Sequence, residues 1–423
     1  MRKEKTEIIE STLSNILRIR PGNINEYSFR ERNGFIKRES GKELHIESGE
    51  FNNRNDLIKT LPENLRRKFF VPVDERSEFD TGSVAKWSDQ ISSFLNKIPG
   101  LEWEIIFKTL KKRKVIKKGG KPDGSPDFTH FSVLIRFKKG NWNNFIEMGE
   151  GNTDGSGFNI SGLVSRLDEI IRCNSEARKR QLTDNLPLIL SPGEGGIVFH
   201  EILGHSLEAD HIKRGLSPFS VSDIGRKVVS ENITLSTFRK GDPFFEKVSH
   251  DDEGVLRSKS TLIERGVLRH LISNHSYSRD LGISDHGSSR MEDFTKRPMP
   301  RMFAIYLENG KYSQNELMGS TGKGIFAREF GDGKVLFHKN QFYFNIPSAY
   351  LIKNGRLSEP LGSIIVSGKI DKVFNSVEMI ADDFSLDRGI SYCFKDGQTL
   401  NVRVGQPSVK INNLTFSRGL NDI

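Results

Sequence analysis

Two histidines and a glutamate, His200, Glu201 and His205, lie within six residues of one another. Neutral imidazoles are good ligands for Zn²⁺, and a neighbouring carboxylate can take a proton from a water molecule whose pKa the bound ion lowers. The residue types therefore point to metal-assisted hydrolysis.

The spacing of these histidines differs from that of the common zinc-protease helix, in which the ligands stand at i and i+4. Here they stand at i and i+5. At roughly 100° per residue, an ideal α-helix leaves the two imidazoles about 140° apart, too far round the helix to share one ion. We therefore predict a π-type turn between His200 and His205, a distortion that is frequent at functional sites. Gly204 eases such a turn or lets another segment approach closely.

The sequence around the histidines predicts a helix. Ser191, Pro192 and Glu194 have the types expected of an N-cap, a first helical position and the glutamate of a capping box. Apolar positions follow at Ile197, Val198, Ile202 and Leu207. They predict that one long helix carries the histidines and is buried among other elements.

Two histidines leave a catalytic zinc site one protein ligand short. Three residues are candidates for the third ligand: Glu208 and His211, which lie close by in sequence, and the distant Cys393. An Asp-Gly pair follows Cys393 by three residues and predicts a tight turn, so the thiolate would project from a strand end in a fixed direction. This favours Cys393, while Glu208 remains an alternative.

Several separated segments resemble the TldD side of the TldD/PmbA (TldE) metalloprotease family, and their order and spacing agree with it. The resemblance covers about residues 186–420 and is faint in the first half of the chain. The segments are HEILGHSLEAD at 200–210, HDDEG at 250–254, KRPMPRM at 296–302, PSAYLIKNG at 347–355 and CFKDGQTLNVRVGQPSVKINNLT at 393–415.

The resemblance implies a zinc metallopeptidase in which His200, His205 and Cys393 hold the ion and Glu201 is the catalytic base. It also implies peptide substrates, small or unfolded, and a heterodimer with a PmbA/TldE-like subunit that lacks the metal motif; a homodimer is the other possibility. The alternative is a non-catalytic, zinc-stabilised assembly or chaperone-like subunit. Glu201 argues against that alternative, because a structural zinc site does not need a base.

The chain departs from the family pattern at two kinds of position. Ser206 and Ala209 stand where the family usually has glycine, so backbone clearance there is expected to differ. The first half also resembles a shortened version of the family's N-terminal domain. We expect this difference to affect partner docking or the cavity wall more than the metal site.

Five further residues are candidates for supporting roles. Arg290, Arg297 and Arg301 lie in or near a proline-containing extended segment, and arginine can bind a peptide carboxylate or carbonyl in bidentate fashion. Glu208 and Asp252 are candidates to orient a zinc-binding imidazole from behind.

Composition sets further limits on the function. The chain has 423 residues, 35% of them hydrophobic, and a net charge of +9. No apolar run predicts a transmembrane span, and the polar residues between Ile8 and Ile16 argue against a signal peptide. Two cysteines far apart in sequence argue against a disulfide framework, and we predict a cytoplasmic protein.

The densest basic run, from Lys108 to Lys121, raises the possibility of nucleic-acid binding. Apolar residues such as Phe107 and Val115 flank the charges, and Gly-Gly and Pro-Asp-Gly follow. This pattern is more typical of a hairpin with a solvated basic face, so we do not expect nucleic acid as a partner.

The predicted fold class is α+β. An N-terminal domain, residues 1–188, mixes helices at about 84–95 and 163–171 with strands such as 131–137, whose apolar residues alternate. A C-terminal domain, residues 189–423, should be dominated by an antiparallel sheet packed on the zinc-motif helix. Its main signal is the presence of glycine-containing turns in 262–268, 350–357 and 393–398.

Overall fold

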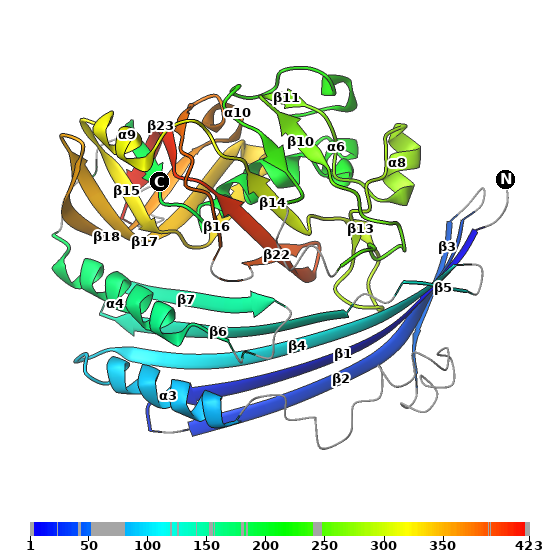
Figure 1. The fold of residues 1–423 in the computed structure, drawn as a ribbon, viewed down its shortest axis with the longest axis horizontal. Coiled ribbons are helices and arrows are strands. Elements are labelled where there is room, and N and C mark those ends of the chain that lie inside the picture. The colour runs from blue at the N-terminus through cyan, green and yellow to red at the C-terminus, as the bar shows by residue number, and fades with distance from the viewer. Residues whose placement is uncertain are drawn as a thin grey trace.

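The fold is α+β and rich in strands, as predicted (Figure 1). The computed structural model describes residues 4–22, 24–40, 44–51, 81–118, 121–124, 127–140, 142–151, 155, 157–178, 182, 185–239, 248–387, 389 and 391–418. Within this part of the chain, every helix is too short or too polar to span a bilayer.

The N-terminal half forms one antiparallel sheet in the order β3-β2-β1-β4-β6-β7, with β5 beside β4. In Figure 1 its long, curved strands run beneath the C-terminal half. The strands are β1 (Glu4–Arg20), β2 (Ile24–Ser40), β3 (Leu44–Glu50), β4 (Glu102–Lys118), β5 (Lys121–Gly124), β6 (Asp127–Lys139) and β7 (Trp142–Gly151).

Alternation along β4 and β6 gives this sheet two different faces. Apolar residues such as Ile105 and Phe107 pack with α3 (Thr81–Leu95) and α4 (Ile160–Glu176) in one core cluster. Residues of the opposite register, such as Lys112 and Lys114, face the C-terminal half, where they contact Met291 and Asp252. The predicted helices and the strand at 131–137 are confirmed.

Polar residues obscure the alternation along the 17-residue strands β1 and β2, so the sequence does not predict them. One sequence expectation for this half differs from the structure. The solvated basic face is wrong for Lys112 and Lys114, whose side chains are 13% and 9% exposed and lie 3.3 Å and 3.6 Å from the carboxylate of Glu10. The Gly-Gly pair at 119–120 lies outside the described residues.

The C-terminal half contains two larger sheets rather than one. The first has the order β15-β8-β23-β18-β17-β16, with β19 beside β23. Most of its pairs are antiparallel, but β8 and β15 are parallel. Its strands are β8 (Leu186–Leu190), β15 (Lys323–Glu329), β16 (Gly333–Leu336), β17 (Gln341–Lys353), β18 (Arg356–Lys369), β19 (Val377–Ile380) and β23 (Val409–Ser417).

The second sheet has the order β11-β10-β9-β14-β22-β20, with β21 beside β22, and β14 and β22 are parallel. Its strands are β9 (Leu235–Ser236), β10 (Thr261–Glu264), β11 (Val267–Leu268), β14 (Ala304–Leu307), β20 (Ser385–Leu386), β21 (Ser391–Lys395) and β22 (Gln398–Gln406). A short ladder joins β12 (Ser289–Arg290) and β13 (Met299–Pro300).

Short helices fill the spaces around these sheets. Those near the histidines are α5 (Gly196–Val198), the π-helix η2 (Phe199–Gly204) and α6 (Ala209–Lys213). The others are η3 (Val221–Asp223), α8 (His275–Leu281), α9 (Gln314–Gly319), η4 (Phe337–Lys339) and α10 (Ile370–Val373).

The three predicted turns are confirmed as two-residue hairpins. In each, both central residues have positive φ, which matches the twist of the flanking strands. They are Arg265-Gly266, Asn354-Gly355 and Asp396-Gly397, with φ values of 45° and 80°, 49° and 74°, and 47° and 74°.

The predicted domain boundary at residue 188 falls inside β8. This strand pairs with β15 and β23 of the C-terminal half, so cutting it would divide one sheet. We therefore propose that the division lies ahead of Leu186.

Candidate metal centre

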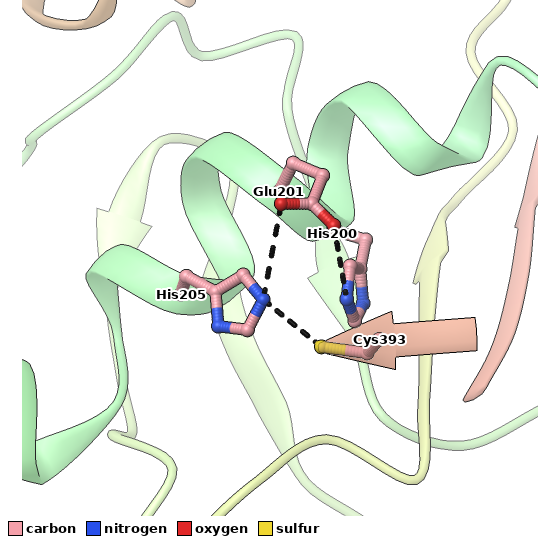
Figure 2. A group of neighbouring side chains, drawn as sticks. All are labelled: His200, Glu201, His205 and Cys393. Carbon is pink, nitrogen blue, oxygen red and sulfur yellow. Dashed lines mark hydrogen bonds and ion pairs between the residues drawn. The ribbon is translucent and has the colours of Figure 1, made fainter. Parts of the chain in front are cut away.

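The segment that carries the histidines is π-helical, as the i, i+5 spacing predicts. The backbone N–H of His205 donates to the carbonyl oxygen of His200, which is the hydrogen bond of a π-turn. This widening returns both imidazoles to one side of the helix, with ring centroids 4.9 Å apart (Figure 2).

The start of this helix differs from the prediction. It begins at Gly196 rather than Pro192, and the preceding residues form a turn in which Gly193 has φ 105°. The side chain of Ser191 donates to the carbonyl of Arg328 instead of capping the helix. Tertiary partners therefore replace the expected capping box.

The helix is also short rather than long. At Glu208 the backbone is extended, with φ −75° and ψ 127°, and it pairs with Ile272 before α6 begins. Gly204 confirms the other expectation, a close approach: a Cβ atom there would collide with the side chain of Met302. The helical turn between the histidines therefore packs directly against the segment that enters β14 of the second sheet.

Cys393 reaches the histidines from β21. Its Sγ lies 3.1 Å from Nε2 of His205, and Figure 2 shows the thiol pointing between the two imidazoles. The carboxylate of Glu201 lies 3.8 Å from Nε2 of His200 and 4.0 Å from Nε2 of His205. One ligand atom from each of these residues lies within 4.8 Å of all the others.

The charges of this cluster are strongly coupled. Burial favours the neutral thiol of Cys393, but the two imidazoles hold its pKa well below the usual range. Burial likewise opposes the imidazolium of His205, but the carboxylate of Glu208 and the thiolate of Cys393 hold its pKa well above normal. Burial raises the pKa of Glu201.

His200 is fully buried, and neither of its ring nitrogens has a hydrogen-bond partner within the described residues. Buried polar groups are rarely left without partners. A metal ion would satisfy one of these nitrogens. Two imidazoles and a thiolate are a donor set that suits zinc, so the residues present fit this ion.

This part of the chain is similar in sequence to proteins that are named metalloproteases. A family model described as the PmbA/TldA metallopeptidase C-terminal domain matches residues 183–418.

The chain belongs to the PmbA/TldA metallopeptidase family.

Two relatives illustrate the extent of the match. A metalloprotease TldD homologue of Buchnera aphidicola is 36% identical over 238 residues, which are 56% of this chain and 49% of the relative. A zinc metalloprotease TldD homologue of Saccharolobus solfataricus is 32% identical over 258 residues, 61% of this chain and 57% of the relative. The chain spans about half the length of the curated relatives it matches.

A solved structure shares the fold over almost its whole length. TldE from Thermococcus kodakarensis superposes with a TM-score of 0.72 at 16% identity, covering 98% of this chain and 97% of that one. The shared fold therefore includes the N-terminal sheet as well as the region matched by the family model.

Glu208 lies behind the histidines in this PmbA/TldA family member. Its Oε2 is 2.7 Å from Nδ1 of His205 and 2.7 Å from Nζ of Lys395, which also bonds Asp210 at 2.7 Å. His205 and Lys395 hold the pKa of Glu208 far below normal despite its burial. Sequence reasoning missed Lys395, although its position two residues after Cys393 places both on one face of β21.

His211, the other candidate ligand, contacts the backbone instead. Its Nδ1 lies 2.8 Å from the carbonyl oxygen of His205. With His205 and Glu208, it does belong to a second group of possible metal ligands. In that group, however, Glu208 already forms an ion pair with Lys395.

Asp252 does not orient an imidazole. It forms an ion pair with Lys114, and its Oδ2 accepts a 2.8 Å hydrogen bond from the N–H of Met291. The prediction for Asp252 is therefore wrong, because the loop after His250 turns this carboxylate toward the N-terminal sheet.

The three candidate arginines do not form one binding site, although Arg290 and Arg301 lie close enough to influence each other's charge. Arg301 is fully buried and donates a 2.7 Å hydrogen bond to the carbonyl of Cys393, so it supports the strand. Arg290 is buried, and Arg297 is exposed. None of the three lines the cavity that opens onto Glu201.

That cavity has a volume of about 310 Å³ and lies between the two halves of the molecule. Phe145 and Glu147 of β7 contribute to one wall, and Tyr392 precedes Cys393 on another. Arg166 of α4 lines it, 3.0 Å from Glu194, and contacts the carboxylate of Glu329 through both Nε and Nη2. The cavity leaves the side chain of Glu201 partly accessible.

Proposed function

We propose that this chain is a zinc-dependent metallopeptidase of the TldD type, acting on small or unfolded peptides. The observation that carries the proposal is the meeting of His200, His205 and Cys393 beside the carboxylate of Glu201, at the end of a cavity. The metalloprotease names of the relatives support the reaction class. The retained metal motif favours the TldD side of the family over the PmbA side.

His200, His205 and Cys393 would hold the ion. Glu208 supports this role of His205 because it engages Nδ1 and leaves Nε2 facing the thiolate. A bound zinc ion supplies Lewis acidity, which lowers the pKa of an attacking water molecule and stabilises negative charge on the peptide carbonyl oxygen.

Glu201 supplies the proton transfers. Its side chain is 22% exposed, whereas that of His200 is fully buried, so this carboxylate can meet a water molecule in the cavity. Burial raises its pKa, which makes it a stronger base than an ordinary glutamate. We assign to it the acceptance of the proton from the attacking water and its delivery to the leaving amine.

The partner is part of the same proposal. TldE from Thermococcus kodakarensis has the fold of this chain, and the retained motif supports our assignment of this chain as the metal-binding member of such a pair. We propose a heterodimer with a PmbA/TldE-like subunit, in which the second chain completes the wall of the peptide cavity.

Metal content and cleavage of an unstructured peptide test this function. We expect about one zinc per wild-type chain and a strong loss of zinc in Cys393→Ala. Cys173→Ala is the matched control, because Cys173 is also buried but its thiol contacts the carbonyl of Ala349. Cleavage should be chelator-sensitive and should be measured with and without a PmbA-like partner.

Two results would contradict the proposal. Equal zinc content in wild type and Cys393→Ala would remove the thiolate from the ligand set and favour Glu208. A wild-type chain without metal and without cleavage, alone and with the partner, would refute the peptidase function.

A further inference from the structure

A second cavity, of about 300 Å³, lies between the N-terminal sheet and the C-terminal half. Tyr392 lines this cavity and the one at Glu201, so its side chain stands between them. One wall is a face of the N-terminal sheet. In that sheet, β1 pairs with β2 on one side and with β4 on the other. The side chains on that face include Arg30, Arg32, Thr12, Ser14, Leu110 and Lys112.

Most of the charged groups around this cavity pair with one another. Lys112 and Lys114 share Glu10, and Lys114 also pairs with Asp252. On the β2 side, the guanidinium of Arg32 pairs with a separate carboxylate, that of Asp293.

Among the buried charged groups that line this cavity, Arg290 is the exception. It is only 7% exposed, yet within the described residues no carboxylate lies within ion-pair distance of its guanidinium. Its contacts are one hydrogen bond donated to the carbonyl of Met302 and a stacking contact with Phe303, 4.3 Å from the ring centroid. Among anionic groups, the carboxylate of Asp252 acts most strongly on the pKa of Arg290, ahead of Cys393 and Glu208, and Lys114 already engages Asp252.

A buried guanidinium without a carboxylate is unfavourable unless a ligand pairs with it. Burial lowers the pKa of Arg290 to about 10, which leaves it charged at neutral pH. With a single hydrogen bond made, the planar guanidinium keeps further N–H groups for a bidentate contact. Apolar side chains line part of the remaining wall, beside the polar residues Thr399 and Asn401 and the acid Glu292; they are Leu110, Val248, Met291, Phe303 and Leu400.

We propose that this cavity binds an organic carboxylate, with Arg290 pairing with the carboxylate and the apolar wall covering a hydrophobic body. A small carboxylic acid and the C-terminus of a peptide both have this chemistry. The site is separate from the metal ligands, so its occupation does not depend on the proposed peptidase function.

The proposal is tested by calorimetric titration of the metal-free full-length chain, so that no carboxylate can bind through zinc. The probes are N-acetyl-phenylalanine, its neutral amide, 3-phenylpropionate, an acetylated tripeptide that ends in phenylalanine, and inorganic phosphate. We expect the carboxylates to bind at least about tenfold more tightly than the amide and phosphate. Tighter binding of the tripeptide would identify a peptide C-terminus as the source, and equal or tighter binding of phenylpropionate a free acid.

Three variants accompany the titration. Arg290→Gln should weaken carboxylate binding at least about tenfold. Arg257→Gln is the matched control, because Arg257 stacks on the same ring, 3.8 Å from its centroid, but does not line the cavity. Ser14→Trp keeps Arg290 and fills the cavity from β1, so it should abolish binding even if Arg290→Gln fails to fold.

Several outcomes would overturn the proposal. These are the absence of binding by any carboxylate at millimolar concentration, equal binding of the acid and its amide, and equal binding of phosphate. Carboxylate binding that survives Ser14→Trp, or that is unchanged in a folded Arg290→Gln chain, would also do so.

Discussion

Two of the buried polar clusters among the described residues, the candidate metal centre and the cluster around Lys114, are assembled in different ways. The metal centre takes all its residues from the C-terminal half, where a short helix meets the hairpin of Cys393. The second cluster joins Glu10, Lys112 and Lys114 of the N-terminal sheet to Asp252 of the other half. The first brings together groups that could hold a metal ion, whereas the second joins the two halves beside a cavity.

Removing the base should have the largest effect on the metal centre. Glu201→Gln keeps the shape of the side chain but cannot accept a proton, so we expect turnover to fall by about 10³-fold while zinc remains bound. Steady-state cleavage and metal analysis measure the two properties separately. Glu231→Gln, at an exposed glutamate with a side chain 70% accessible, is the control. Near-normal turnover in Glu201→Gln would remove Glu201 from the mechanism.

A substitution in the second cluster should lower the free energy of unfolding and leave zinc binding unchanged. Lys114→Met leaves the buried carboxylate of Asp252 without its ion-pair partner, and we expect a loss of about 3 kcal/mol in the free energy of unfolding. Urea unfolding measures the loss, and zinc content should remain normal in the folded variant. Lys138→Met, at an exposed lysine of β6, should cost much less. A loss of zinc from folded Lys114→Met would show that the two clusters are coupled.

The sequence predicts the candidate metal centre but not the ion pairs of the second cluster, and the reason is physical. The metal centre depends on local rules: the i, i+5 spacing requires a π-turn, and an Asp-Gly pair fixes the hairpin that presents Cys393. The ion pairs of Lys114 depend on strand register, because Glu10 faces Lys114 only when two 17-residue strands align. No nearby residue in the sequence signals that alignment, so the basic run looks solvated.

The same difference between local and tertiary signals explains why the prediction for Asp252 is wrong. Glu208 and Asp252 were both candidates to orient an imidazole. The carboxylate of Glu208 reaches Nδ1 of His205 because the chain turns extended directly after the π-helix. Asp252 follows a loop whose direction depends on its contact with Lys114, which only the tertiary structure reveals.

Lys395 offers a finer test of the metal centre. Its removal should free Glu208 from a 2.7 Å contact and weaken the hold on His205, so we expect zinc affinity in Lys395→Met to fall about 10-fold to 100-fold. Competition with a chelator of known affinity measures the change. Lys353→Met is the matched control, since Lys353 also precedes a two-residue hairpin turn but is 48% exposed. Unchanged affinity in Lys395→Met would limit Lys395 to a structural role.

The smallest effect concerns pH and the second cluster. Burial opposes ionisation of Asp252, but Lys114 and Lys112 hold its pKa below the normal value of 3.8. In the unfolded chain Asp252 takes up its proton at higher pH, so its contribution to stability is complete well above pH 3.8 and is lost as the pH falls through the folded-state pKa. Asp252→Asn lacks this contribution at every pH. In metal-free protein, urea unfolding should show the wild type more stable near pH 7, with the difference shrinking by about pH 3. A difference that stays constant over this range would mean that Asp252 stabilises the interface through its hydrogen bond to Met291 rather than through its charge.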